Sequence, residues 1–200
     1  MFYFGFEQEM IKLIVGLGNP GKEYHNTRHN LGYKVIDELA KRNKKRLKEG
    51  KGEYFFCEME SDNRQLFLVK PSTFMNICGW AVVDCLGDFD MKPENLFVLC
   101  DDVNLPLGNI RIRESGSDGG HKGLRSIIYQ LNTLNFARLR MGVEKPEEGI
   151  DLEEYVLEDF KEEELEKAGG MIDQAAGAVE DTVALGIKEA MNKYNQRILH

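Results

Sequence analysis

The sequence predicts a single α/β domain of three layers, α/β/α, built on a twisted, mostly parallel (mixed) sheet. Short apolar runs typical of buried strands alternate along the chain with segments of helical periodicity. The length of 200 residues suits one domain, and no internal repeat interrupts the alternation. With 42% hydrophobic and 30% charged residues, the chain can bury a sizeable core. We therefore expect one domain over residues 10–200.

Residues 1–9 are interpreted as an optional N-terminal extension. They are aromatic, but they lack the basic start and the cleavage site of a secretion signal and contain Glu7 and Glu9. Met10, directly before the first predicted strand, offers a second start. No apolar run approaches the roughly 20 residues that a membrane helix needs. We expect a cytoplasmic protein with no membrane partner.

The first half of the chain is predicted to form a strand, a helix, a hairpin and a second helix. Residues 11–17 are a buried apolar run of strand length, and apolar residues recur at helical spacing over residues 27–42. The segments "EYFFCEME" and "RQLFLVKP" flank "SDN", which is typical of a β-hairpin. "GWAVVDCLGDF" has a helical pattern, and Pro93 marks the break that follows it.

The second half continues the alternation. Residues 95–102 read as a buried strand, and residues 108–115 alternate like an edge strand. A glycine loop then leads into a helix within residues 119–131, and residues 136–143 form a further strand. From about Leu152 onward the pattern is helical.

A glycine motif follows the first strand. Gly16, Gly18 and Gly21 spell G-x-G-x-x-G, the written form of a dinucleotide-binding fingerprint. In that fingerprint the helix begins at the glycines, so that the backbone amides of its first turn face the pyrophosphate. Here the next apolar helical position, Leu31, lies ten residues beyond Gly21. We interpret the glycines as a tight turn, and a nucleotide-cofactor enzyme stays as an alternative.

His29, in "NTRHN", is predicted to lie in the first turn of the helix, at the open end of the sheet where α/β folds bind ligands. The positive end of the helix dipole disfavours an imidazolium. A neutral histidine there is a candidate general base. A surface or helix-capping histidine is the alternative.

Charge is unevenly distributed along this acidic chain, whose formal net charge is −8. Residues 145–167 hold eleven acidic residues against three lysines, whereas residues 109–140 hold six basic residues against two acidic ones. A local basic cluster can bind phosphates despite the global charge. The six basic residues are Arg111, Arg113, Lys122, Arg125, Arg138 and Arg140.

The four cysteines form no C-x-x-C pair, and the chain has only four histidines. We therefore expect no metal site and interpret the cysteines as buried reduced thiols of a cytoplasmic protein.

Five motifs follow one another in order: "VGLGNPGKEYHNTRHNLG", "PSTFMNICG", "DDVNLPLG", "GGHKGLRSI" and "FARLRMGV". Together they resemble a bacterial-type peptidyl-tRNA hydrolase from about Ile11 to the helical tail. "EEYVLEDF" is similar to the family's lid, which places a lid segment at about residues 147–162. The resemblance implies an esterase that cuts the bond between a peptide's carbonyl and the 3′-terminal ribose of tRNA, and so recycles peptidyl-tRNA released from ribosomes. It also implies a monomer without cofactor or metal.

The resemblance assigns the catalytic roles to three residues. His29 matches the catalytic base, and Asp101 matches the carboxylate that orients it. Asn19 matches a residue that helps tell an N-blocked peptidyl group from a free aminoacyl group. From the residues alone, Asp101 at the end of a buried strand is equally well a loop cap.

Further positions match the family's substrate side. Asn76 matches an amide that contacts the substrate, and amide donors can hold a developing oxyanion. Tyr24 and Phe74 match positions near the 3′-terminal nucleotides, where an aromatic ring can stack on a base; core packing is the alternative for Phe74. Arg140 and Arg113 match basic residues on the tRNA side.

The chain departs from the family pattern at three positions. Lys122 stands where asparagine is usual, Asn104 where an acid is common, and Glu144 where glycine is common. An ammonium only donates, whereas an amide also accepts, so Lys122 serves either the reacting ester or the RNA phosphates. A non-enzymatic RNA-binding protein on the same scaffold is the remaining alternative.

Overall fold

A computed structural model describes residues 10–61 and 64–195 of the chain. Seven strands form one mixed sheet in the order β2-β3-β4-β1-β5-β7-β6. The strands are β1 (Leu13–Gly16), β2 (Lys48–Glu49), β3 (Tyr54–Ser61), β4 (Arg64–Pro71), β5 (Leu96–Asp102), β6 (Ile110–Arg113) and β7 (Ala137–Gly142). The α-helices are α1 (Leu31–Arg42), α2 (Gly79–Asp88), α3 (Lys122–Leu131), α4 (Leu152–Val156), α5 (Leu165–Leu185) and α6 (Ile187–Tyr194). The extension expected at residues 1–9 lies outside the described residues.

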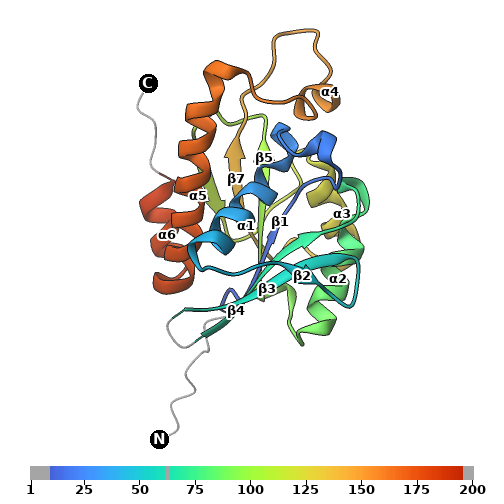
Figure 1. The fold of residues 1–200 in the computed structure, drawn as a ribbon, viewed down its shortest axis with the longest axis vertical. Helices are drawn as coiled ribbons and strands as arrows, with labels where there is room; N and C mark the ends of the chain where they lie inside the picture. Colours follow the sequence, from blue (N-terminus) through green and yellow to red (C-terminus); the bar gives the residue numbers. More distant parts are fainter. Residues whose placement is uncertain (1–9, 62–63, 196–200) are drawn as a thin grey trace, which may run out of the picture.

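Two apolar cores, one on each face of the sheet, give the three layers that the sequence predicts. On one face, α1 and α5 pack with Ile14, Phe97 and Leu139. On the other face, α2 and α3 pack with Val15 and Val98. Neighbouring residues of the central strands thus point to opposite faces, which explains why these strands are apolar without alternation. Figure 1 shows the sheet between the two helical layers. The α/β prediction is confirmed.

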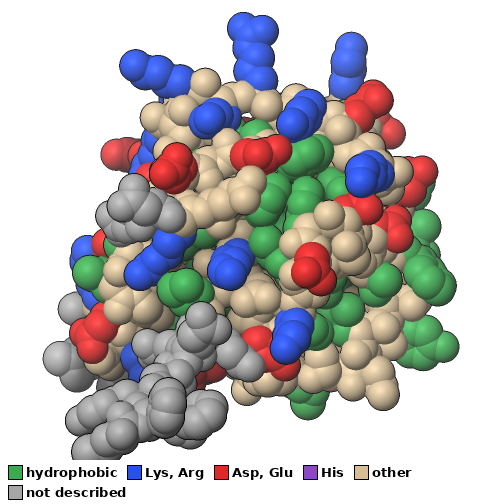
Figure 2. All heavy atoms as spheres, turned by 90° about the horizontal axis from the view of Figure 1, so that it is seen from below, with side chains coloured by type: hydrophobic (Ala, Val, Ile, Leu, Met, Phe, Trp, Pro, Cys, Tyr) green, Lys and Arg blue, Asp and Glu red, His purple; other side chains and the backbone are tan. Residues whose placement is uncertain are grey.

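The parallel strands β4, β1, β5 and β7 lie side by side at the centre of the sheet. Their carboxyl ends therefore meet at one edge of the sheet, below α4 (Figure 1). The opposite end of the molecule carries a mixed surface, on which basic side chains project along one margin and hydrophobic ones lie between charged ones (Figure 2). Because ligands bind at the carboxyl ends of parallel strands, we expect a ligand site under α4.

Most predicted elements are present, including the β3–β4 hairpin and the edge strand β6. Three details differ. His29 lies on a 3₁₀ turn, Arg28–Asn30, that precedes α1, instead of on the α-helix itself. The short strand β2 was not predicted. The C-terminal helical region is divided, because Gly186 adopts a φ of +92° and ends α5 before α6 begins.

Among the described residues, no helix has the length and apolar character to cross a membrane. The four cysteines are buried and unpaired, as the sequence indicates.

Candidate active site

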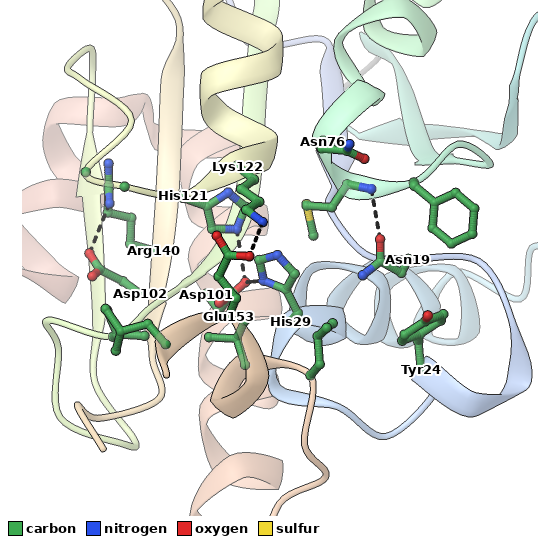
Figure 3. A pocket seen from close by; sticks show the side chains of 18 residues that line it. Asn19, Tyr24, His29, Asn76, Asp101, Asp102, His121, Lys122, Arg140 and Glu153 are labelled. Atoms are coloured by element: carbon green, nitrogen blue, oxygen red, sulfur yellow. Dashed lines mark hydrogen bonds and ion pairs between the residues drawn. The ribbon is translucent and has the colours of Figure 1, made fainter. Parts of the chain in front are cut away.

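A cleft of about 390 Å³ opens at the carboxyl ends of β1 and β5, between α3 and α4. Eight of the nine predicted site residues line it, and Figure 3 shows them around the opening. They are Asn19, Tyr24, His29, Phe74, Asn76, Asp101, Lys122 and Arg140. Arg113 lies outside the cleft, on β6.

Gly16 of the glycine motif and Gly32 of α1 bring His29 to the end of the sheet by close packing of backbone on backbone. A Cβ on Gly16 would lie 2.2 Å from the carbonyl oxygen of Gly32 in α1, and a Cβ on Gly32 would lie 2.3 Å from the amide nitrogen of Leu17. Only glycine fits these two positions. The start of α1 therefore lies directly on the end of β1, and the preceding 3₁₀ turn holds His29 above β5. Gly16, the first glycine of the dinucleotide-like motif, thus helps to place a histidine here.

His29 and Asp101 form a buried pair. The ring nitrogen Nδ1 of His29 lies 2.8 Å from Oδ1 of Asp101, and the two side chains are 9% and 2% exposed. The carboxylate accepts a hydrogen bond from Nδ1–H, so we assign the Nδ1–H tautomer to the neutral ring. Nε2 of His29 then carries a lone pair. This is the arrangement that a general base requires.

His121 is a second partner of Asp101, and the sequence did not assign it a role. Its Nε2 donates to the same oxygen, Oδ1, at 3.0 Å, while its Nδ1 accepts from the backbone N–H groups of Gly123 and Leu124 at 3.1 and 3.2 Å. These three bonds fix the Nε2–H tautomer and make His121 the N-cap of α3. A polar residue directly before a predicted helix is the signal that could have identified this cap.

Burial and charge act together on the pKa values of this cluster. Burial lowers the pKa of His121, which favours its neutral ring. Burial alone would raise the pKa of Asp101, but attraction and hydrogen bonds from His29 and His121 outweigh burial and lower it. Asp101 therefore stays a carboxylate over the ordinary pH range.

The same three residues place three potential metal ligands within 4.8 Å of one another. A metal on Nε2 of His121 needs the lone pair of that atom, which moves the ring proton to Nδ1. That proton would then face the N–H groups of Gly123 and Leu124. The hydrogen bonding thus fits a donor–acceptor network better than a metal centre.

Asn19 is held with its donor side free for a ligand. Its Oδ1 accepts from the backbone N–H of Met75 at 2.8 Å (Figure 3). Its backbone is bound by the Asn30 amide at 2.8 and 3.0 Å. The Nδ2 group of Asn19 remains to donate into the cleft. Oriented in this way, Asn19 can bind an acceptor but not another donor.

The two ends of the cleft differ in chemistry. At one end Tyr24 and Phe74 meet edge to face, with ring centroids 6.4 Å apart, and Phe74 is 52% exposed. This exposure excludes the core-packing alternative for Phe74. At the other end Arg140 binds Asp102 at 3.1 Å and the carbonyl of Ser117 at 2.8 Å. One end is therefore aromatic and open, and the other is polar.

The basic cluster predicted over residues 109–140 is smaller at the surface than in the sequence. Arg138 is 1% exposed, lies over the Phe136 ring and donates to the carbonyl of Gly116. Burial lowers the pKa of Arg138 to about 10. Arg138 is thus an internal residue, whereas Arg111 and Arg113 are exposed on the edge strand β6.

The helix α4 and the residue after it cover the cleft with Leu152, Glu153, Val156 and Leu157. Lys122 Nζ, at the start of α3, lies 2.5 Å from Oε2 of Glu153, so this ion pair joins the two walls. The chain after α4 is fastened by Arg28, which is 1% exposed. Arg28 donates to the carbonyl of Asp159 at 2.9 Å and to Glu164 at 2.8 Å, and its guanidinium lies 4.3 Å from the centroid of the Tyr155 ring. The sequence singled out neither Arg28 nor Glu153.

A model of the family described as peptidyl-tRNA hydrolase matches residues 13–199. The chain belongs to the peptidyl-tRNA hydrolase family. Members of this family cleave the ester bond of peptidyl-tRNA, so the reaction class that the sequence resemblance implies is confirmed at the level of the family.

Similar peptidyl-tRNA hydrolases match over nearly the whole chain. That of Alkaliphilus oremlandii is 46% identical over 183 residues, which are 92% of this chain and 98% of the relative. That of Chlorobaculum tepidum is 46% identical over 188 residues, 94% of this chain and 100% of the relative. The crystal structure of the peptidyl-tRNA hydrolase from Acinetobacter baumannii has a TM-score of 0.88 at 34% identity and covers 96% of this chain and 97% of its own.

Proposed function

We propose that this chain hydrolyses the ester that joins a peptide, or an N-blocked amino acid, to tRNA, with His29 as the general base. The observation that carries the proposal is the buried pair of His29 and Asp101 at the floor of a cleft in a peptidyl-tRNA hydrolase fold. The substrate class follows from the family, and the residue roles rest on the geometry of the cleft.

In the first step, Nε2 of His29 takes a proton from a water molecule that attacks the ester carbonyl. The ring becomes an imidazolium, and the carboxylate of Asp101 stabilises its charge through the bond to Nδ1. The amide of Asn76, at the rim of the cleft, donates to the oxyanion that develops on the carbonyl oxygen. Return of the proton from His29 to the ribose oxygen releases the tRNA.

Asn19 provides the discrimination against free aminoacyl-tRNA. Its free Nδ2 group donates, and a peptidyl group offers a carbonyl acceptor on the amide that blocks its nitrogen. A free aminoacyl group has an ammonium in that place, which is also a donor and leaves the amide of Asn19 unpaired. A site built to bind one hydrogen-bonding group strongly rejects analogues that lack that group.

The RNA contacts divide between stacking and charge. The exposed ring of Phe74 and the ring of Tyr24 offer a platform for a 3′-terminal base. Arg113 is free to meet the phosphate backbone, whereas Arg140 already binds Asp102 and Ser117 and mainly shapes the cleft wall. Lys122 can reach either the ester or a phosphate.

We also propose a cytoplasmic monomer that acts without cofactor or metal and without a membrane partner. Four buried free thiols suit a reducing compartment, and burial raises the pKa of Cys78 to about 12, which keeps it unreactive. Light scattering after size exclusion tests the oligomeric state, and a dimer at micromolar concentration would contradict a monomer.

Turnover separates the hydrolase from a non-enzymatic RNA-binding protein. We expect wild-type protein to release labelled N-acetyl-aminoacyl groups from tRNA and to leave unblocked aminoacyl-tRNA intact. In Asn19→Asp the acceptor of the Met75 bond is kept while the donor is lost, so discrimination should fall. Tight tRNA binding without release of the label would favour the binding protein.

A further inference from the structure

Lys122 and Glu153 point toward one another from opposite walls of the cleft, as Figure 3 shows. Both residues line the cleft that also holds His29 and Asp101. Their ion pair, 2.5 Å from Nζ to Oε2, joins the start of α3 to the first turn of α4. A substrate that enters between the two helices therefore meets this pair before it reaches His29.

The position of Lys122 has no evident structural benefit. It is the first residue of α3, where the positive end of the helix dipole disfavours a cation. The pair with Glu153 is also solvated, since the two side chains are 45% and 67% exposed. An exposed pair of this kind adds little to the stability of a fold. The cation is therefore better explained by an anion that binds there.

The surroundings of Lys122 suit a phosphate group. His121 already binds the N–H groups of Gly123 and Leu124 at the start of α3, so the ammonium of Lys122 is the group that would bind a phosphate, and lysine is a common phosphate ligand. Gly120, two residues before Lys122, also lines the cleft and has no atom within 4 Å of the place where a Cβ would lie, so this loop does not fill the cleft. The carboxylate of Glu153 occupies part of this anion position in the free protein.

We propose that Glu153 is an internal competitor for the RNA: it pairs with Lys122 in the free protein and is replaced by a phosphate of the substrate's 3′-terminal nucleotides. This inference rests on the proposed function for its ligand. Exchange of one anion for the other frees the first turn of α4 from α3, so the cleft opens as the RNA binds. Glu153 then determines how readily substrate enters.

The anchoring of α4 near Tyr155 supports an opening of the cleft at the first turn of this helix. Tyr155, at the other end of the helix, donates to the carbonyl of Val143 at 2.8 Å and lies under Arg28. The end of α4 near Tyr155 is therefore fixed. Lys122–Glu153 is the only ion pair among the described residues that joins α4 to α3.

The first test measures the free protein and needs no turnover. Hydrogen exchange of the α4 amides should be faster in Glu153→Gln than in wild type, and added NaCl should speed the wild type but not the variant. Glu154→Gln is the matched control, because it removes the same charge from the same exposed turn without touching Lys122. Equal exchange in all three proteins would overturn the proposal.

The second test measures KM with N-acetyl-aminoacyl-tRNA. Glu153→Gln should lower KM by about 1.5- to 5-fold, the range expected for release of one exposed ion pair, and Glu154→Gln should change it less. Lys122→Gln should raise KM more in the Glu153→Gln background than in wild type, because the lysine then meets phosphate without competition. Additive effects of the two substitutions on KM would overturn the proposal.

If none of the proteins turned over substrate, the proposed function itself would fail. The hydrogen-exchange data would still decide whether the Lys122–Glu153 pair holds α4.

Discussion

His121 shows how one side chain can serve the fold and the site together. It caps α3 through Nδ1 and holds Asp101 through Nε2. Asp101 thereby accepts two hydrogen bonds on a single oxygen. A substitution of His121 removes both the cap of α3 and the bond to Asp101. A new side chain that restores only the cap therefore separates the two functions.

Stability should depend on pH through His121. Burial lowers its folded-state pKa, whereas the unfolded chain titrates near the ordinary histidine value of about 6.5. The unfolded state therefore binds the extra proton first, and stability is lost as the pH falls below about 6.5, by at most ~1.4 kcal/mol per pH unit. Urea unfolding of wild type at pH 8, 6.5 and 5 measures this loss.

Two variants at position 121 complete the experiment. In His121→Asn the amide can still cap α3 but cannot titrate, so its curve of stability against pH should be flatter than that of wild type. His121→Ala also loses the cap and should be less stable than His121→Asn by about 0.5–2 kcal/mol. Parallel curves of stability against pH for wild type and His121→Asn would show that the pH dependence does not come from His121.

At the scale of elements, two arginines with similar numbers of partners should differ in their effect on stability. Arg28 is buried, whereas Arg42 meets Glu38, Asp173 and Glu180 in solvent, with a side chain 30% exposed. Arg28→Ala removes the side-chain donor to the Asp159 carbonyl, leaves Glu164 with only the Lys161 N–H, and empties a buried site, so it should cost about 3–5 kcal/mol. Arg42→Ala should cost at most about 1 kcal/mol. Equal costs in chemical denaturation would show that Arg28 does not fasten the segment after α4.

The elements also show where sequence reasoning succeeds. The central strands were predictable because both of their faces are buried, which leaves an uninterrupted apolar run. The strand β2 was not, because its two exposed residues, Lys48 and Glu49, pair through the backbone and show no pattern. The lid segment proposed at residues 147–162 includes α4, but the resemblance that marked it gave no contacts.

The same contrast holds within the site. His29, Asp101 and Asn19, which line one cleft, could be proposed as site residues from the sequence because short motifs mark them. The bonds of His121 to Asp101, of Arg28 to Glu164 and of Glu153 to Lys122 join residues 20 or more positions apart and depend on how the layers pack. Arg138 and Arg113 look alike in the sequence, and only packing makes one internal and the other exposed.

At the scale of the whole molecule, an acidic chain must bind a polyanion through a local surface. The double variant Arg111→Ala, Arg113→Ala should weaken binding of full-length tRNA more than it slows a short 3′-fragment. It should also flatten the slope of log K against log salt by up to about 1.8, since each lost phosphate contact contributes about 0.9. Arg42→Ala is the control, because Arg42 is engaged in ion pairs on the α1–α5 side. An unchanged slope would place the RNA on another surface.

The central claim is that His29, held by Asp101, activates water. The most direct measurement is the single-turnover rate of His29→Ala on N-acetyl-aminoacyl-tRNA at saturating enzyme, with Asp101→Asn beside it. We expect His29→Ala to be slower by about 10²–10⁴ with tRNA affinity and thermal unfolding nearly unchanged, and Asp101→Asn to retain more activity. A wild-type rate in His29→Ala would contradict the mechanism.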